Sequence, residues 1–291
     1  MKIKIIALSD TMKNIKDGDF WVKKDLEAAF SGRGHEIVNA GADLDFYLFG
    51  LYSSGHHMSA PRRFCWIYSH PDLVGRSQWP EFAKQFEHIF VLSNSFILDK
   101  KFDGERDKTS VLLGASSKTL ILREREARYD IVFVGAMRHG KRLDTMRHLI
   151  EAGKYQICLV GVGWDKALGS LIKNVDYKGD YIDNHLLGDF FNQGLFSFYS
   201  AHEDMRLAGF VAVRILDIFR SSECLCVSDK NIGLKDMFRD IPIYENKDGL
   251  MDKIDWFLKH PIEREAIALS CRKDAMERTF TKTVIEVEKW L

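Results

Sequence analysis

Two charged residues interrupt a strongly apolar segment in the C-terminal half of the chain. Residues 210–219 are otherwise almost entirely apolar, which predicts a helix that is buried on nearly all sides. Arg214 and Asp217 are the exceptions, and because they are three positions apart, both side chains leave the helix on one face. Buried charges are costly without a partner. The two residues therefore either pair with each other or contact a ligand.

Several familiar binding and catalytic motifs are missing from the sequence. Residues 161–163 (GVG) follow a predicted strand, but Lys166 occupies the place of the third glycine in a dinucleotide-binding fingerprint. The phosphate-binding pattern Gly-x-x-x-x-Gly-Lys-Ser/Thr and the serine-nucleophile pattern Gly-x-Ser-x-Gly do not occur. The adjacent His56 and His57 have no third ligand at metal-binding spacing. These observations argue against a nicotinamide or flavin enzyme, a P-loop hydrolase, a serine hydrolase and a metal site.

Predicted strands and helices alternate through both halves of the chain, which favours mainly parallel sheets. A charged run at 116–129 precedes a fresh strand and is the best candidate for a linker. We therefore expect domains at 1–120 and 128–278, with a terminal helix at 279–291 able to pack back on the first. The predicted strands are 2–8, 36–38, 45–51, 63–68, 88–93, 111–115, 131–136, 156–161, 175–177, 195–200 and 224–227. The predicted helices are 20–30, 80–86, 140–152, 183–192, 210–219, 247–259, 262–278 and 281–291. A short helix capped at 93–94 could run to residue 100, and another begins at Gly233.

Composition narrows the class of protein. The chain has 291 residues, 46% of them apolar, and its 42 basic and 42 acidic side chains give a net charge of zero. A generic nucleic-acid binder usually has a basic excess. The five cysteines are odd in number and lie mostly in apolar runs, so we expect buried, reduced thiols. Without a signal peptide or an apolar run long enough to cross a membrane, the sequence predicts a soluble, cytoplasmic protein.

Five segments of the chain match a known family pattern. They are residues 26–38 (LEAAFSGRGHEIV), 129–142 (YDIVFVGAMRHGKR), 177–201 (YKGDYIDNHLLGDFFNQGLFSFYSA), 209–229 (GFVAVRILDIFRSSECLCVSD) and 258–284 (LKHPIEREAIALSCRKDAMERTFTKTV). The first resembles the opening common in two-domain GT-B glycosyltransferases, and the other four, in order and spacing, resemble the CgeB-like branch of that superfamily. The resemblance implies an α/β fold of the GT-B type, with two Rossmann-like domains whose mainly parallel sheets face each other across a cleft. It also implies that a sugar nucleotide binds mainly to the second domain.

The resemblance gives the charged helix a role. Asp217 corresponds to a carboxylate that would accept hydrogen bonds from both ribose hydroxyls, and Arg214 would contact phosphate or orient Asp217. A helix beginning near Gly209 would direct free backbone N–H groups at the diphosphate. Arg138, Lys141 and Arg142 would add positive charge beside the leaving diphosphate. Alternatively, Lys141 and Arg142 would be solvent-exposed residues at the start of a helix. The implied donor-binding residues are Arg138, Arg142, Gly179, Tyr181, Ile182, Gly209, Phe210, Arg214 and Asp217.

The implied reaction transfers a sugar from a nucleotide-diphosphate donor of the UDP or GDP type. Negative charge develops on the leaving phosphate, and helix N-termini and arginines can stabilise it without a metal. We expect no metal and no cofactor beyond the donor, because no Asp-x-Asp motif stands in the expected context. An inverting enzyme would need a base for the acceptor hydroxyl, and the candidates are Asp10, Asp19, His70 and Asp72. A retaining enzyme would not need one.

Two other functions remain compatible with the sequence. One is a nucleotide-sugar epimerase on the same fold, and the other is a catalytically silent module that binds nucleotide sugars. Products formed from pure donor would separate the first from a transferase, and the absence of turnover with any acceptor would identify the second. The acceptor (a glycan, a protein, a nucleic acid or a small molecule), the donor sugar, the stereochemistry and the oligomeric state stay open.

Overall fold

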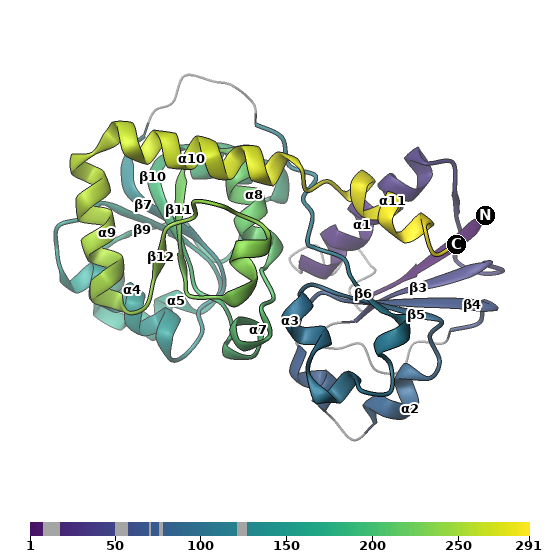
Figure 1. Cartoon of the computed structure of the whole chain (residues 1–291). Coiled ribbons are helices and arrows are strands. Elements are labelled where there is room, and N and C mark those ends of the chain that lie inside the picture. Colours follow the sequence, from purple (N-terminus) through teal and green to yellow (C-terminus); the bar gives the residue numbers. More distant parts are fainter. Residues whose placement is uncertain (8–17, 50–57, 70, 76–77, 121–126) are drawn as a thin grey trace.

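The computed structural model describes residues 1–7, 18–49, 58–69, 71–75, 78–120 and 127–291. They form two α/β domains, each built on one six-stranded sheet (Figure 1). Every strand pair in both sheets is parallel. The predicted fold of two Rossmann-like domains is confirmed.

The N-terminal sheet has the strand order β2-β1-β3-β4-β5-β6. All six residues of β3 are buried, as expected of a strand in a parallel sheet that is covered on both faces. Its strands are β1 (Lys2–Ile6), β2 (Glu36–Ile37), β3 (Leu44–Phe49), β4 (Arg62–Ile67), β5 (His88–Val91) and β6 (Thr109–Val111). Its helices are α1 (Gly18–Gly32), α2 (Trp79–Ala83) and α3 (Asn94–Ile97), with 3₁₀ turns η2 (Pro71–Gly75), η3 (Lys100–Phe102) and η4 (Arg106–Lys108).

The C-terminal sheet has the order β12-β11-β10-β7-β8-β9. Its strands are β7 (Tyr129–Val134), β8 (Ile157–Val160), β9 (Asp176–Tyr177), β10 (Gly194–Tyr199), β11 (Leu225–Asp229) and β12 (Ile243–Tyr244). The helices that follow or cover it are α4 (Lys141–Glu151), α5 (Trp164–Leu168), α6 (Leu187–Asn192), α7 (Glu203–Ala208), α8 (Val213–Ser221), α9 (Lys247–Lys259) and α10 (Pro261–Met276). Its 3₁₀ turns are η5 (Gly169–Asn174), η6 (Asn184–Leu186) and η7 (Ile232–Asp236).

The last helix, α11 (Phe280–Glu288), leaves the C-terminal domain and lies beside α1 (Figure 1). Phe280, Val284 and Val287 are buried in the hydrophobic core of the N-terminal domain. Arg33 at the end of α1 forms an ion pair of 2.7 Å with Glu288. The end of the chain therefore contributes to the first domain's core.

Two short helices, α5 and α7, and the short strand β12 were not predicted. In α7 only Met205 is buried, so its six residues carry no helical periodicity that a sequence could reveal. The two residues of β12 are likewise too few for an alternating pattern. The strand predicted at 111–115 lies two residues earlier, at β6.

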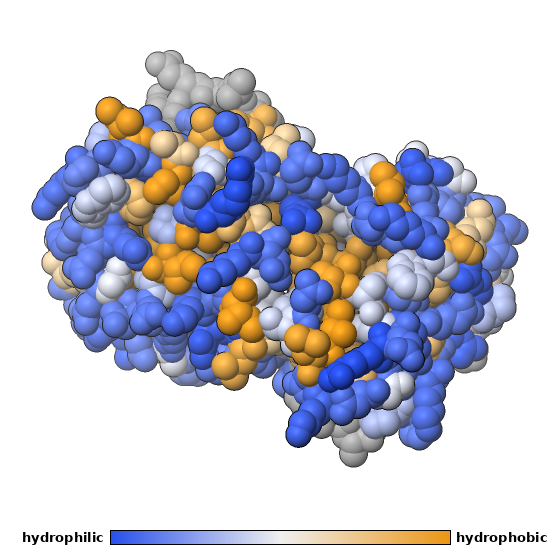
Figure 2. All heavy atoms as spheres, viewed as in Figure 1, coloured by the Kyte–Doolittle hydropathy of each residue, from blue (hydrophilic) through white to orange (hydrophobic). Residues whose placement is uncertain are grey.

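Hydrophilic side chains cover most of the face shown in Figure 2, and apolar ones gather near the junction of the two domains. Within the described ranges, no helix is both long and apolar enough to span a membrane.

Candidate active site

A cavity of about 550 Å³ lies between the two domains. The first turns of α1, the end of β4 and the linker at Lys118 form one wall, and the loops after β7 and β8, together with α8, form the other. Parallel α/β sheets bind ligands outside the carboxyl ends of their strands, which is where this cavity lies. The cleft is therefore the candidate binding site.

Arg214 and Asp217 both line the cavity. They also contact each other, with 3.4 Å between Arg214 Nη1 and Asp217 Oδ2. The hydroxyl of Ser116, in the linker, donates to the other carboxylate oxygen of Asp217 at 2.7 Å. Asp217 is only 8% exposed. Pairing with each other and contact with a ligand are thus compatible, because the two side chains pair across one turn and still face the cleft.

The predicted start of this helix was wrong. Helix α8 begins at Val213, and Gly209 instead ends α7 in a left-handed conformation with φ +76°. A Cβ atom on Gly209 would lie 2.6 Å from Ser93 Oγ, so the glycine permits close packing against the first domain. Phe210 is fully buried and packs edge-to-face on Phe96, with 4.8 Å between ring centroids. Gly209 and Phe210 do not line the cavity, which α8 reaches at Ala212.

Arg138 and Arg142 follow β7 and line the cavity. Burial and the neighbouring Arg142 lower the pKa of Arg138 to about 10, so it remains a cation at neutral pH. Arg142 donates to the carbonyl oxygens of Ala136 (3.0 Å) and Ser200, and burial lowers its pKa as well. Arg138 is thus a cation of the cleft wall, whereas Arg142 also ties the loops after β7 and β10 together.

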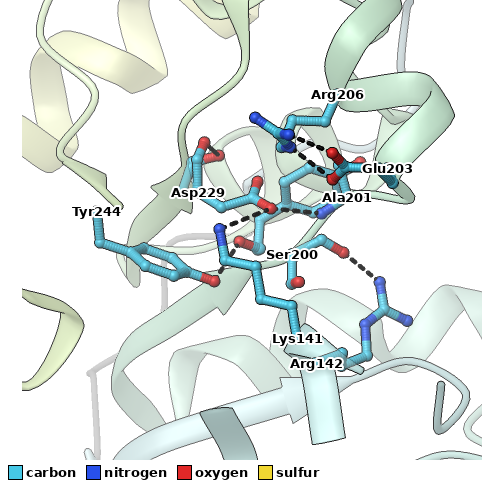
Figure 3. Close-up of polar contacts among 10 residues, drawn as sticks. Lys141, Arg142, Ser200, Ala201, Glu203, Arg206, Asp229 and Tyr244 are labelled. Atoms are coloured by element: carbon cyan, nitrogen blue, oxygen red, sulfur yellow. Dashed lines mark hydrogen bonds and ion pairs between the residues drawn. The ribbon is translucent and has the colours of Figure 1, made fainter. Parts of the chain in front are cut away.

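Lys141 lies outside the cavity lining, at the carboxyl edge of the sheet (Figure 3). Its Nζ is 3.7 Å from Oδ2 of Asp229, which also accepts a 3.1 Å hydrogen bond from the Ala201 N–H. Asp229 is fully buried, and burial raises the pKa of its carboxyl while Lys141 opposes the rise. Lys141 is exposed at the first residue of α4, as the solvated-helix-start alternative expects, and it also compensates a buried carboxylate.

The predicted base-binding loop lies partly in the cleft. Tyr181 and Ile182 line the cavity together with Asp180, and Gly179 does not. The carbonyl of Gly179 accepts a 3.0 Å hydrogen bond from the Gly161 N–H, which joins this loop to the end of β8.

Of the candidate bases, Asp19 lies in the cavity wall at the start of α1. It lies beside Tyr68, whose pKa is raised well above its usual value by burial and by the negative charge of Asp19. Asp72 is exposed on η2 and does not line the cavity. His70 and Asp10 lie outside the described residues.

Sequence reasoning missed Asp25, Trp21 and Lys118, which also line the cleft. Ser117 Oγ donates to Asp25 at 2.8 Å, and burial raises the pKa of Asp25 to about 6. Burial lowers the pKa of Lys118, while Asp217 and Asp25 oppose that change. The spacing of these residues in α1 could have predicted a shared face. Asp19 and Val22 are three positions apart and Trp21 and Asp25 are four apart, so each pair lies on the same side of the helix.

Comparison with known proteins identifies the fold's relatives. The sequence profile of a family described as "Glycosyl transferase-like" matches residues 138–284, just over half of the chain. The chain belongs to this glycosyl transferase-like family. No curated protein sequence matches it significantly.

Solved structures of GT-B glycosyltransferases share the fold of the whole chain. HepE of Anabaena in complex with UDP-glucose has a TM-score of 0.69 and 11% identity, over 100% of both chains. A DNA-modifying β-glucosyltransferase, solved with and without UDP-glucose, has a TM-score of 0.63 and 12% identity over 95% of this chain and 94% of that one. TarM has a TM-score of 0.62 and 13% identity over 84% of this chain, which spans only 54% of TarM.

The C-terminal wall of the cleft gathers cationic side chains. Three arginines and two carboxylates of this glycosyltransferase domain line the cleft (Arg138, Arg142, Arg214, Asp180 and Asp217). The described residues contain no group of three or more histidine, cysteine, aspartate or glutamate side chains able to hold a metal ion. Such a wall can attract a diphosphate and hydrogen-bond sugar hydroxyls.

Proposed function

We propose that this glycosyltransferase moves a sugar from a nucleotide-diphosphate donor to an acceptor hydroxyl in the interdomain cleft. The observation that carries the proposal is the convergence of Asp217 with Arg138, Arg142 and Arg214 on one wall of the cavity. The family and the shared GT-B fold support sugar transfer in general. The motifs of the second domain support a place in the CgeB-like branch.

The donor is proposed to lie along the C-terminal wall. Asp217 would accept hydrogen bonds from the ribose hydroxyls, while Ser116 and Arg214 hold its carboxylate in place. Tyr181 and Ile182 would border the base. Because HepE was solved with UDP-glucose, UDP-glucose is the first donor to test.

Arg138 and Arg214 are proposed to stabilise the leaving diphosphate. Their guanidinium groups can donate hydrogen bonds to phosphate oxygens as the sugar–oxygen bond breaks. The N-terminus of α8 reaches the cavity at Ala212 and Val213 and adds the positive end of a helix dipole. These groups supply charge stabilisation without a metal, and we propose metal-independent transfer.

Asp19 is the proposed base for an inverting reaction. It lines the cavity from the N-terminal wall, opposite the arginines. A carboxylate there can take the proton of an acceptor hydroxyl as that oxygen attacks the anomeric carbon.

Release of UDP from UDP-glucose, with water as a slow acceptor, tests this proposal. Arg138→Ala should lower the rate on the order of 10²-fold, because a donor aimed at the developing charge is lost. Arg147→Ala removes an exposed arginine of α4 and should leave the rate unchanged. EDTA should leave the rate of UDP release unchanged. This control matters because T4 phage β-glucosyltransferase was solved with UDP and Mn²⁺. Equal rates for the two variants would contradict the assignment of Arg138.

A further inference from the structure

The N-terminal wall of the cleft carries a different set of groups from the donor wall. Helix α1 contributes Asp19, Trp21 and Asp25 to the cavity, and Tyr68 joins them from the end of β4. Trp21 is partly exposed and packs edge-to-face on Phe20, with 5.3 Å between ring centroids. Two aromatic side chains, of which Trp21 is the more exposed, and two carboxylates therefore face the space that an acceptor would occupy.

The two walls also differ in charge. Among the described residues of the cavity, the C-terminal wall has three arginines against Asp180 and Asp217. The N-terminal wall has two carboxylates, Asp19 and Asp25, against the single ammonium of Lys118. An acceptor rich in phosphate would meet like charges on this wall, which is unfavourable. A neutral acceptor would meet none.

Uncharged carbohydrates match this set of groups. An ionised carboxylate only accepts hydrogen bonds, and sugar hydroxyls donate them. An indole offers a large, rigid apolar surface at small entropic cost, and it can cover the C–H groups of a sugar ring. The Ser117 hydroxyl holds the Asp25 carboxylate at 2.8 Å, so its orientation is fixed before any ligand arrives.

We propose that the α1 wall binds a neutral carbohydrate as the acceptor, with Trp21 packing on its ring and Asp25 and Asp19 accepting its hydroxyl hydrogens. The inference rests on the proposed function, since it names the acceptor class for the same cleft. It also separates this protein from the DNA-modifying neighbour, whose acceptor is a polyanion.

Saturation-transfer NMR with the intact protein in the presence of UDP tests the acceptor class. The probes are a panel of methyl glycosides and disaccharides, glucose 6-phosphate, and a short DNA duplex. At least one neutral sugar should bind, and the phosphorylated sugar and the DNA should bind more weakly. Binding of DNA or of the phosphorylated sugar alone, or of no neutral sugar, would overturn the proposal.

Two cleft variants and two controls then locate the site. Trp21→Ala and Asp25→Asn should each raise the dissociation constant for the neutral sugar by about tenfold, as expected for the loss of about 1.4 kcal/mol. Trp256→Ala, on exposed α9, and Asp107→Asn, in exposed η4, should leave it unchanged. Sugar affinity that is the same in cleft and control variants would reject the α1 wall.

UDP affinity keeps this test separate from the proposed function. The cleft variants should bind UDP within about twofold of the unmodified protein, because the donor wall is intact. A protein that binds neutral sugar but not UDP would refute the proposed donor chemistry and leave the carbohydrate subsite standing. A protein that binds UDP but no neutral sugar would refute the carbohydrate subsite and leave the proposed donor chemistry standing.

Discussion

Asp25 shows how burial changes a single carboxylate of the cleft. Desolvation is the largest influence on it and raises its pKa to about 6, against the hydrogen bond from Ser117 and the charge of Lys118. In the unfolded chain the same group titrates near its ordinary value. Between those two pH values the folded protein keeps a proton that the unfolded chain has released.

This difference predicts a pH-dependent gain in stability from Asp25→Asn. Because the folded state binds more protons, the ionisation of Asp25 lowers stability as pH rises through the window between about 4 and 6. The variant removes that penalty, and its amide oxygen can still accept from Ser117. Its melting temperature should exceed that of the unmodified protein at pH 8 and match it more closely at pH 4. A gain that is equal at both pH values, or a similar pH-dependent gain in Asp107→Asn, would contradict the explanation.

Asp217 differs because its charge has partners. Ser116 and Arg214 each contact one carboxylate oxygen, at 2.7 and 3.4 Å. The serine comes from the linker and the arginine from the same helix. A carboxylate held in this way can bind a ribose with little loss of side-chain freedom, which favours affinity.

At the scale of elements, the turn between α7 and α8 fixes where α8 begins. Gly209 ends α7 with φ +76°, and Ser93 and Gly233 lie close to it. The backbone then runs extended to Ala212, the N-cap of α8. This turn sets which residues of the apolar segment reach the cleft.

Gly209→Ala should therefore destabilise the fold without weakening donor binding. The variant incurs backbone strain and a contact with Ser93, together about 2–4 kcal/mol of unfolding free energy. Gly41→Ala is the matched control, since Gly41 has φ +66° and no atom within 4 Å of an added Cβ. It should cost only about 1 kcal/mol. Chemical denaturation measures the unfolding free energy of both variants. A Gly209→Ala protein with normal stability but weak UDP binding would instead support a contact between Gly209 and the donor.

Much of the architecture could be predicted from the sequence because its signals are local. Apolar runs such as 131–134 and 157–160 predict buried strands, and the long amphipathic segments near the C-terminus predict α9 to α11. Strands and helices alternate, so parallel pairing follows. Short elements such as α7, in which only Met205 is buried, lack such a signal.

The parts of the site that escaped prediction depend on contacts between distant residues. Asp25 and Ser117 are 92 positions apart, and Ser116 and Asp217 are 101 apart. The sequence predicts that Gly209 contacts the ligand, whereas in the structure Gly209 packs against Ser93. Ser93 belongs to the other domain, so this contact has no local sequence signal. Lys141 was assigned to phosphate or solvent because the buried Asp229 beside it could not be foreseen.

At the scale of the whole molecule, the two domains present walls of opposite character to one cavity. Helix α11 crosses from the second domain and buries Phe280, Val284 and Val287 in the core of the first. Arg220 joins the linker to α10 through the carbonyls of Lys118, Ala275 and Met276. These connections place the α1 wall opposite α8, as a transfer between two bound substrates requires.

The proposed donor site predicts that the wall carrying Asp217 binds UDP. Isothermal titration of UDP into the intact protein, Asp217→Ala and Asp252→Ala tests it most directly, with melting curves confirming that each variant is folded. Asp252 is an exposed carboxylate of α9 and serves as the control. Loss of hydrogen bonds to a charged group should weaken UDP binding by Asp217→Ala about 10- to 100-fold, with Asp252→Ala unchanged. Equal affinity of all three folded proteins, or no UDP binding by the unmodified protein, would show that Asp217 does not hold the donor.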